Sequence, residues 1–116
     1  MQNKISELYF KETYPIKNYA TKNECVYLFY NELTKLSKIG ITSNISQRYR
    51  SLETSGGVIL KLYGLCEIEK NEHESAKYIE SYLHKFFKEQ RKEGEWFNLN
   101  FCQQIQIINL FLKISD

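Results

Sequence analysis

The sequence has little proline, little glycine and no large excess of charge of either sign. Its 116 residues include one proline and five glycines, which argues against a disordered or linker-dominated chain. The formal net charge is only +2, so the overall charge does not by itself indicate a nucleic-acid partner. We therefore expect one compact domain, in which any basic binding surface is local.

Paired cysteines and long apolar runs are also missing. Cys25, Cys66 and Cys102 are far apart and form no Cys-x-x-Cys pair, which favours reduced, buried thiols over a zinc site or a disulfide framework. No apolar run approaches the ~20 residues that a membrane span needs, and the N-terminal MQNKISELYFKETYP lacks the apolar region of a signal peptide. These features predict a cytoplasmic protein with no membrane partner.

Aromatic residues make up 15% of the chain, and they gather in short runs that are typical of strands. The run CVYLFY at residues 25–30 predicts a strand buried on both faces, and SKIGI at residues 37–41 predicts its hairpin partner. The longest such run, VILKLYGLCEI at residues 58–68, predicts a third strand. Gly64 within it predicts a bulge or a close approach of another element.

Three apolar stripes at helical spacing predict helices. The first helix is expected from Asn44, a good N-cap residue, to Glu53. The second follows an N-cap at Asn71 and ends near Arg91, and the third follows Asn100. This order of elements predicts an α+β fold, a small antiparallel sheet covered by helices, over residues 23–116. Residues 1–22 stay unassigned.

Five polar residues fall where this layout brings them to one edge of the sheet. They come from the first strand, the second strand and two helices: Tyr27, Lys38, Arg48, Glu80 and His84. A carboxylate beside the apolar stripe of a helix needs a cation or hydrogen bonds to compensate for lost water. Ordinary explanations stay open: an amphipathic tyrosine, a solvated lysine, a simple ion pair and a structural histidine.

Several short motifs in this order resemble the GIY-YIG nuclease superfamily. They are CVYLF, LSKIGIT, Arg48 ten positions after Lys38, IESYLH and GEWF, and they extend from about Cys25 to Leu99. The closest resemblance is to the branch with a KIG second signature and C-terminal Glu-x-x-x-His and EWF motifs. It implies a three-stranded antiparallel sheet flanked by helices, and metal-dependent hydrolysis of DNA phosphodiester bonds with Mg²⁺ or Mn²⁺.

The resemblance also implies roles for individual residues. Tyr27 matches the first signature tyrosine, a candidate proton acceptor, and Lys38 stands where many members have the second one. Arg48 matches a helix arginine that faces the scissile phosphate, and Glu80 matches the metal ligand. These roles suit phosphodiester hydrolysis, because a guanidinium and a metal ion stabilise the charge that develops on the phosphate oxygens.

Other positions are implied to support the substrate. Gly40 would let the backbone pass close beneath DNA, and Asn98 matches an asparagine that often follows the metal-binding glutamate. Arg50 belongs to the local basic footprint beside Arg48. His84 is a possible substitute base, because Leu52 stands where some members carry a histidine.

The expected function is therefore a small DNA endonuclease or nicking domain of the kind found in phages and mobile elements. Residues 1–22 are too few for a standard DNA-reading domain, so a homodimer or a partner protein would supply specificity. The alternative is a catalytically inactive domain of the same fold that binds nucleic acid or protein. A purely structural interaction protein is a third reading.

Overall fold

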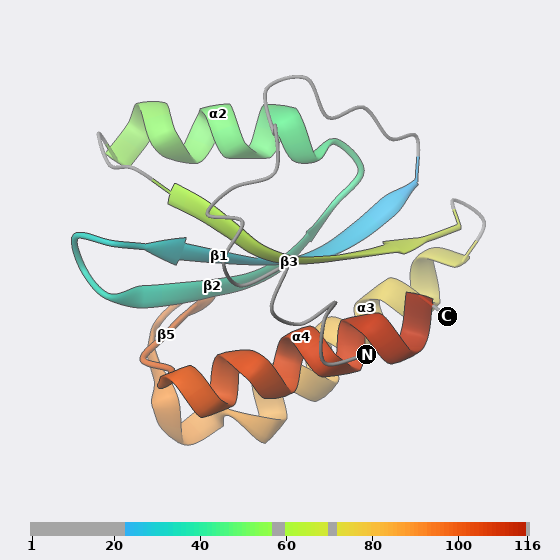
Figure 1. The fold of residues 1–116 in the computed structure, drawn as a ribbon. Coiled ribbons are helices and arrows are strands. Elements are labelled where there is room, and N and C mark those ends of the chain that lie inside the picture. Colours follow the sequence, from blue (N-terminus) through green and yellow to red (C-terminus); the bar gives the residue numbers. More distant parts are fainter. Residues whose placement is uncertain (1–22, 57–59, 70–71, 116) are drawn as a thin grey trace.

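The computed structural model describes residues 23–56, 60–69 and 72–115 (Figure 1). Five strands in the order β3-β1-β2-β5-β4 form one antiparallel sheet. The strands are β1 (Glu24–Asn31), β2 (Leu36–Thr42), β3 (Leu60–Ile68), β4 (Arg91–Glu93) and β5 (Trp96–Phe97). The helices are α2 (Ile45–Gly56), α3 (His73–Phe86), the 3₁₀ turn η3 (Lys88–Gln90) and α4 (Phe101–Ser115). No described helix is both long enough and apolar enough to cross a membrane.

The expected α+β class is confirmed, but the expectation of three strands is wrong. β4 and β5 extend the sheet beyond β2, because β5 pairs with Ser37 and Lys38. These two strands are three and two residues long, too short for an alternating apolar pattern to show in the sequence. Their tight connection uses Gly94 at φ +55°, a left-handed conformation that glycine adopts without a steric penalty.

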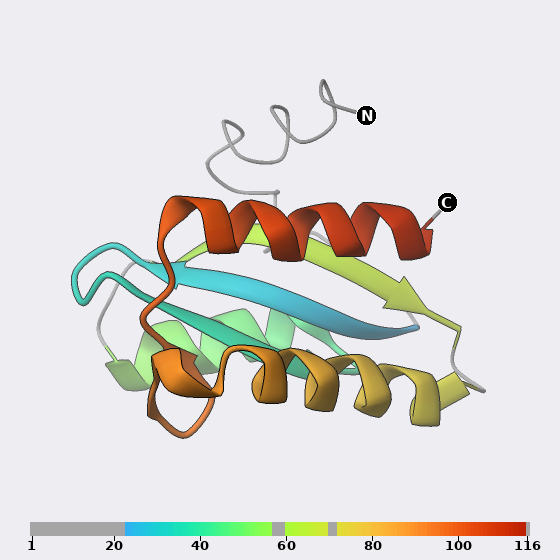
Figure 2. The ribbon, with the colours of Figure 1, turned by 90° about the horizontal axis from the view of Figure 1, so that it is seen from below.

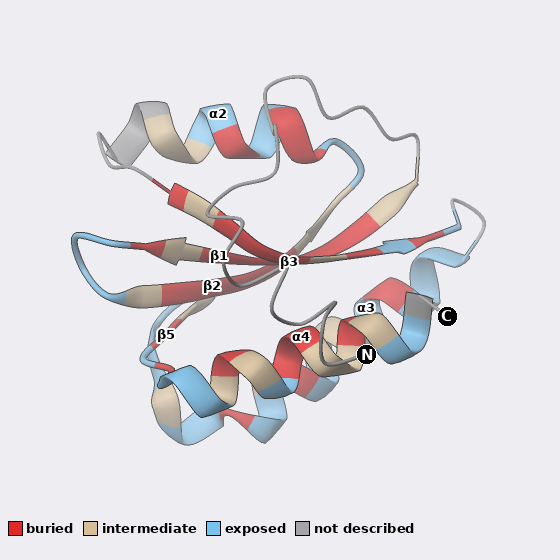
Figure 3. Cartoon of the chain, in the orientation of Figure 1, coloured by how far each residue is buried: buried red, intermediate tan, exposed pale blue. Residues whose placement is uncertain are grey.

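The sheet separates two layers of helices. Helix α2 covers one face, and α3 and α4 lie side by side across the other (Figures 1 and 2). The larger core lies under α3 and α4, and the smaller one lies under α2 (Figure 3). Residues of β1 alternate between them: Tyr27 and Phe29 belong to the smaller core, and Val26 and Leu28 to the larger.

Strand β1 is the central strand of the three longest, with β2 and β3 as its neighbours. The five residues from Cys25 to Phe29 are fully buried, which confirms the expectation of a strand covered on both faces. Two of the predicted buried thiols, Cys25 and Cys66, are indeed buried, and neither is in a disulfide. Cys102 is exposed, because it lies in the first turn of α4 on the side away from the sheet; its predicted burial is wrong.

Gly64 of β3 provides both features expected of it. The register against β1 shifts there, since Leu28 pairs with Gly64 while Phe29 pairs with Leu62. A side chain at this glycine would also meet helix α4, because an added Cβ would lie 3.0 Å from Cδ2 of Phe111. The bulge and the close approach of α4 therefore occur at one residue.

Side-chain caps begin two of the helices as expected. Asn44 Oδ1 accepts a hydrogen bond of 3.0 Å from the backbone N–H of Gln47. At α4, Asn100 Oδ1 accepts one of 2.8 Å from the N–H of Gln103, whose own side chain accepts one of 2.9 Å in return. This reciprocal pair is a capping box, which satisfies donors that the first helical turn leaves without partners.

Two helices end at residues other than the expected ones. Helix α2 continues to Gly56 instead of ending at Glu53. Helix α3 ends at Phe86, before the expected Arg91, because the chain tightens into η3 and then extends as β4. The N-cap expected at Asn71 lies outside the described residues, and Glu72, the residue before α3, makes no side-chain cap.

Candidate active site

The candidate site lies along the edge of β2 beyond the point where β5 stops pairing with it. The backbone N–H of Ile39 donates to the carbonyl of Glu95 at 3.1 Å, and β5 pairs no further along this strand. Beyond this point, side chains of α3 form hydrogen bonds with the backbone of β2. His84 Nε2 lies 2.9 Å from the carbonyl of Ile39, and the N–H of Ile41 donates to the carboxylate of Glu80.

Two carboxyl groups meet at this edge. Glu80 comes from α3 and Glu95 from the turn between β4 and β5, and their side chains share a hydrogen bond. Burial, the charge of Glu95 and this hydrogen bond raise the pKa of Glu80 to about 7. The N–H of Ile41 and the charge of Lys38 act in the opposite direction but do not cancel the increase. The pair therefore retains a proton near neutral pH.

Lys38 supplies positive charge to this pair. Its Nζ lies 3.3 Å from Oε1 of Glu95 and 5.2 Å from the centre of the Trp96 ring. The lysine side chain is 11% exposed, whereas that of Glu95 is 38% exposed. The ammonium group is thus held within the site by an ion pair and an aromatic face, and does not extend into solvent as an edge lysine would.

Tyr27 lies beneath the same edge, with its hydroxyl against the backbone of Gly40. A Cβ at Gly40 would lie 2.9 Å from Glu95 Oε1, and it would overlap the Tyr27 hydroxyl. Glycine is therefore required here for a close approach, although the groups that approach are the protein's own side chains. The Tyr27 hydroxyl is fully buried and has no hydrogen-bond partner among the described residues.

The electrostatics of Tyr27 differ from the expectation for a proton acceptor. Burial and the charge of Glu95 raise the pKa of its hydroxyl well above the ordinary value, and Arg48 lowers it only in part. The expected depression of this pKa by neighbouring cations is therefore absent. A neutral phenol in this position is a hydrogen-bond donor.

Arg48 comes from helix α2, on the face of the sheet opposite α3 and α4. It is exposed on α2, the helix that covers the face of the sheet toward which Tyr27 points, and its charge acts on the Tyr27 hydroxyl. Glu80 comes from α3 on the opposite face, but its charge also acts on Tyr27, because Glu80 reaches the open edge of β2. The structure thus brings five sequence-predicted residues to one edge: Tyr27, Lys38, Arg48, Glu80 and His84.

Two predicted substrate contacts lie elsewhere. Arg50 is exposed on α2, but it is two residues from Arg48 and therefore points to another side of the helix. Asn98 is exposed and lines a separate polar pocket with residues of η3, β4 and the start of α4, among them Arg91 and Gln103. Neither residue is gathered around Glu80.

Three residues form a set of possible metal ligands. One ligand atom from each of Glu80, His84 and Glu95 lies within 4.8 Å of the others. With Nε2 facing the carbonyl of Ile39, the His84 ring donates there and keeps Nδ1 as its free nitrogen. Carboxylate oxygens suit Mg²⁺ and Mn²⁺, and a nitrogen donor suits transition-metal ions, so Mn²⁺ fits this mixed set more fully than Mg²⁺.

Glu95 is the residue that sequence reasoning missed. It belongs to the EWF motif, so the sequence contained a signal, but no role followed from the motif alone. Its position depends on the hairpin of β4 and β5, which directs the carboxylate back toward Gly40 and Lys38. Those strands were not predicted.

Comparison with protein families gives one match, and it corrects the resemblance drawn from the motifs. The T5orf172 domain model matches residues 24–112, and no GIY-YIG model does, so the assignment to the GIY-YIG superfamily is wrong. The motifs behind that assignment are short, and they depart from the GIY-YIG pattern at Cys25, Val26 and Lys38. No curated protein and no solved structure matches the chain. Because the match spans most of its length, the chain belongs to the T5orf172 domain family.

Proposed function

We propose that this protein is a metal-dependent endonuclease that hydrolyses DNA phosphodiester bonds at the edge of β2. The observation that carries the proposal is the buried Tyr27 hydroxyl, which has no partner among the described residues and lies beside the Glu80–Glu95 pair. A buried hydroxyl without a partner costs about 1–3 kcal/mol. Such a group is explained if a ligand supplies the missing partner.

The charges around this hydroxyl suit a phosphodiester. Arg48, whose charge acts on the Tyr27 hydroxyl, and Lys38, which pairs with Glu95, are positive groups at this edge, and the neutral phenol of Tyr27 is a donor beneath it. These groups stabilise negative charge that grows on the phosphate oxygens as the bond to the leaving oxygen breaks. The two cations come from different layers of the fold, so a phosphate between them would be held in a defined orientation.

A divalent ion fits the carboxyl pair. Glu80, Glu95 and His84 would hold it, with Mn²⁺ or Mg²⁺ as the ion. Such an ion supplies Lewis-acid polarisation of a phosphate oxygen and a more acidic water. Glu80 and Glu95 would bind it as carboxylates, and the positive charge of the ion would offset the repulsion between them once their shared proton is lost.

Two observations favour a second candidate, a binding domain without catalysis. Lys38 is already neutralised by Glu95 at 3.3 Å, and the pKa of Tyr27 is far too high for a proton acceptor. A site of this kind would hold a nucleic-acid phosphate without activating water. The two candidates differ in whether strands are broken, so one assay separates them.

The test is nicking of supercoiled plasmid by purified protein with Mn²⁺ or Mg²⁺. We expect nicks with the wild type and a loss of about 10²-fold or more in rate for Glu80→Gln. Glu74→Gln is the matched control, because Glu74 is exposed in the first turn of the same helix. A gel shift without nicks would favour the binding domain, and equal nicking by both variants would place the activity elsewhere.

A further inference from the structure

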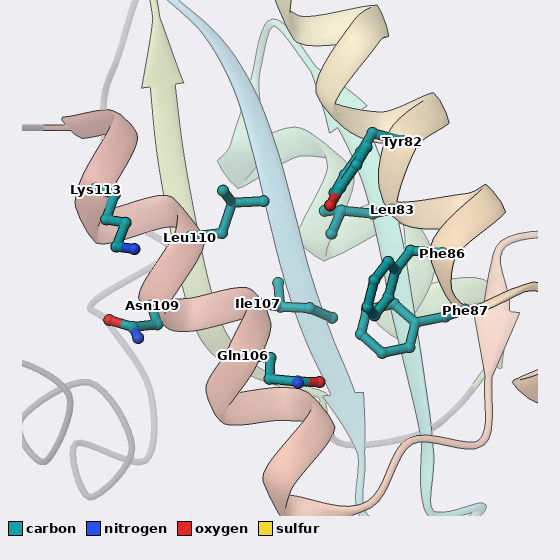
Figure 4. A pocket seen from close by; sticks show the side chains of 9 residues that line it. All are labelled: Tyr82, Leu83, Phe86, Phe87, Gln106, Ile107, Asn109, Leu110 and Lys113. Atoms are coloured by element: carbon teal, nitrogen blue, oxygen red, sulfur yellow. The ribbon is translucent and has the colours of Figure 1, made fainter.

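Helices α3 and α4 leave a groove between them on the face of the molecule opposite α2. It has a volume of about 250 Å³ and is lined chiefly by Tyr82, Phe86 and Phe87 of the α3 side and by Ile107 and Leu110 of α4 (Figure 4). Ile107 and Leu110 of α4 point across the gap toward α3. None of these residues takes part in the candidate active site.

The groove exposes more aromatic surface than the fold requires. Tyr82 is 47% exposed and Phe86 is 59% exposed, and their rings stack with centres 6.0 Å apart. Tyr78, one helical turn earlier on α3, is 72% exposed, so the aromatic ridge continues beyond the groove. A contiguous aromatic surface of this kind is typical of a site that another segment covers.

The α4 side of the groove also carries polar residues. Asn109 lines it from α4, with its Oδ1 on the side of the helix that faces away from α3 (Figure 4). Lys113 adds a cation, one helical turn further along α4. An occupant with an apolar face and an acidic side chain would match the aromatic surface and Lys113.

We propose that the occupant is the N-terminal segment of this same chain, residues 1–22. Its sequence ISELYF places Ile5, Leu8 and Tyr9 at the spacing of one helix face, and Glu12 follows Leu8 on that face one turn later. The apolar face matches the aromatic ridge, and Glu12 complements Lys113. The segment precedes the family match, which begins at residue 24.

The segment is long enough to reach the groove. It joins the domain at β1, where Glu24 Oε1 lies 2.6 Å from Nδ1 of His73 at the start of α3. From His73 to the Tyr82–Phe86 part of the groove is about 14–20 Å along the helix at ~1.5 Å per residue. The residues between Glu12 and Glu24 span roughly 35 Å or more when extended, at ~3.3 Å per residue.

Disulfide trapping in the full chain tests this docking. In a Cys102→Ser background, Leu8→Cys is combined with Phe86→Cys in one variant and with Lys113→Cys in another, since both partners are exposed at the groove. The control combines Leu8→Cys with Ser51→Cys, which is exposed on α2 across the sheet. We expect the groove variants to form an intramolecular disulfide at least about tenfold faster than the control, because docking raises the effective thiol concentration.

Each other outcome overturns the proposal. Equal rates in the groove variants and the control would mean that the segment does not dock, and would leave the groove for a partner protein. Disulfide-linked dimers formed in preference to intramolecular bonds would mean that a second copy fills it. As a check that does not depend on disulfide geometry, Leu8→Asp should increase dye binding to exposed apolar surface, whereas Lys4→Asp should not.

Discussion

The carboxyl groups of Glu80 and Glu95 share a hydrogen bond, although one comes from helix α3 and the other from the turn between two very short strands. Glu95 also forms an ion pair with Lys38, whose Nζ lies 3.3 Å from its Oε1. The edge of β2 therefore holds two acids that repel one another when both are ionised. The positive charge of Lys38 offsets only part of this repulsion.

The pH dependence of stability should reveal this pair. The pKa of Glu80 is raised from 4.5 to about 7 by folding, so its favourable contribution to the free energy of unfolding is complete below pH 4.5 and is lost as the pH rises through 7. Denaturant unfolding with a chelator present, between pH 4 and 8, should show a steeper fall for the wild type than for Glu80→Gln. Glu74→Gln should behave as the wild type; the same slope in all three proteins would contradict the assignment.

Manganese should stabilise the folded protein through the same residues. An ion at about 100 times its Kd adds about 2.7 kcal/mol to the free energy of unfolding, which raises Tm by roughly 10 °C in a domain of this size. Thermal unfolding with and without Mn²⁺ measures this increase in Tm. Glu95→Gln should lose most of the increase, and Glu93→Gln, exposed in the same hairpin, should keep it. A full increase in Glu95→Gln would remove Glu95 from the ligand set.

Removing the Tyr27 hydroxyl should separate stability from activity. Tyr27→Phe deletes a buried group that has no partner among the described residues, so the free energy of unfolding should stay the same or rise by up to about 1–3 kcal/mol. Plasmid nicking should nevertheless fall by at least about tenfold, because the donor to the phosphate is lost.

Tyr49→Phe is the matched control for this change. The Tyr49 hydroxyl donates to Glu53 at 2.9 Å, so its removal should cost about 1 kcal/mol and leave nicking unchanged. A large loss of stability in Tyr27→Phe would show that its hydroxyl has a partner in solution.

Gly40→Ala should disturb the site through its own side chains. The new methyl group would overlap the Tyr27 hydroxyl and lie 2.9 Å from Glu95 Oε1, so we expect a loss of about 1–3 kcal/mol in the free energy of unfolding. Gly94→Asn is the comparison, since that glycine has open space around it and asparagine tolerates its positive φ. Equal stability of the two variants, measured by denaturant unfolding, would mean that β2 moves freely to make room.

Two arginines of α2 should differ in kinetics. Arg48→Ala should lower kcat by about 10²-fold, because its charge acts where Tyr27 and the phosphate would meet. Arg50→Ala should leave kcat unchanged and weaken DNA binding. The slope of log affinity against log salt concentration should fall by about one. Nicking kinetics at several salt concentrations distinguish these effects, and a reversed pattern would mean that α2 presents its other side to DNA.

The sequence was sufficient where one local rule decides the structure. Asn44 and Asn100 cap helices because their side chains reach N–H groups two or three residues ahead, and Gly64 marks the bulge because a larger side chain would meet Phe111. Tyr27, Lys38 and Glu80 could be brought together from strand order and helix periodicity. No local pattern predicts β4 and β5, which exist because β2 offers an edge, and Glu95 was therefore missed.

Helix α2 is the one described helix on its face of the sheet, whereas α3 and α4 share a larger core on the other. Its contacts depend on a short stripe formed by Ile45, Tyr49 and Leu52. A helix held in this way opens at a lower free energy than two helices that pack over a common core, so its amide hydrogens should exchange with solvent first. Arg48 therefore lies on the element with the lowest free energy of local opening. Glu80, Lys38 and Glu95 lie on elements that open at a higher free energy.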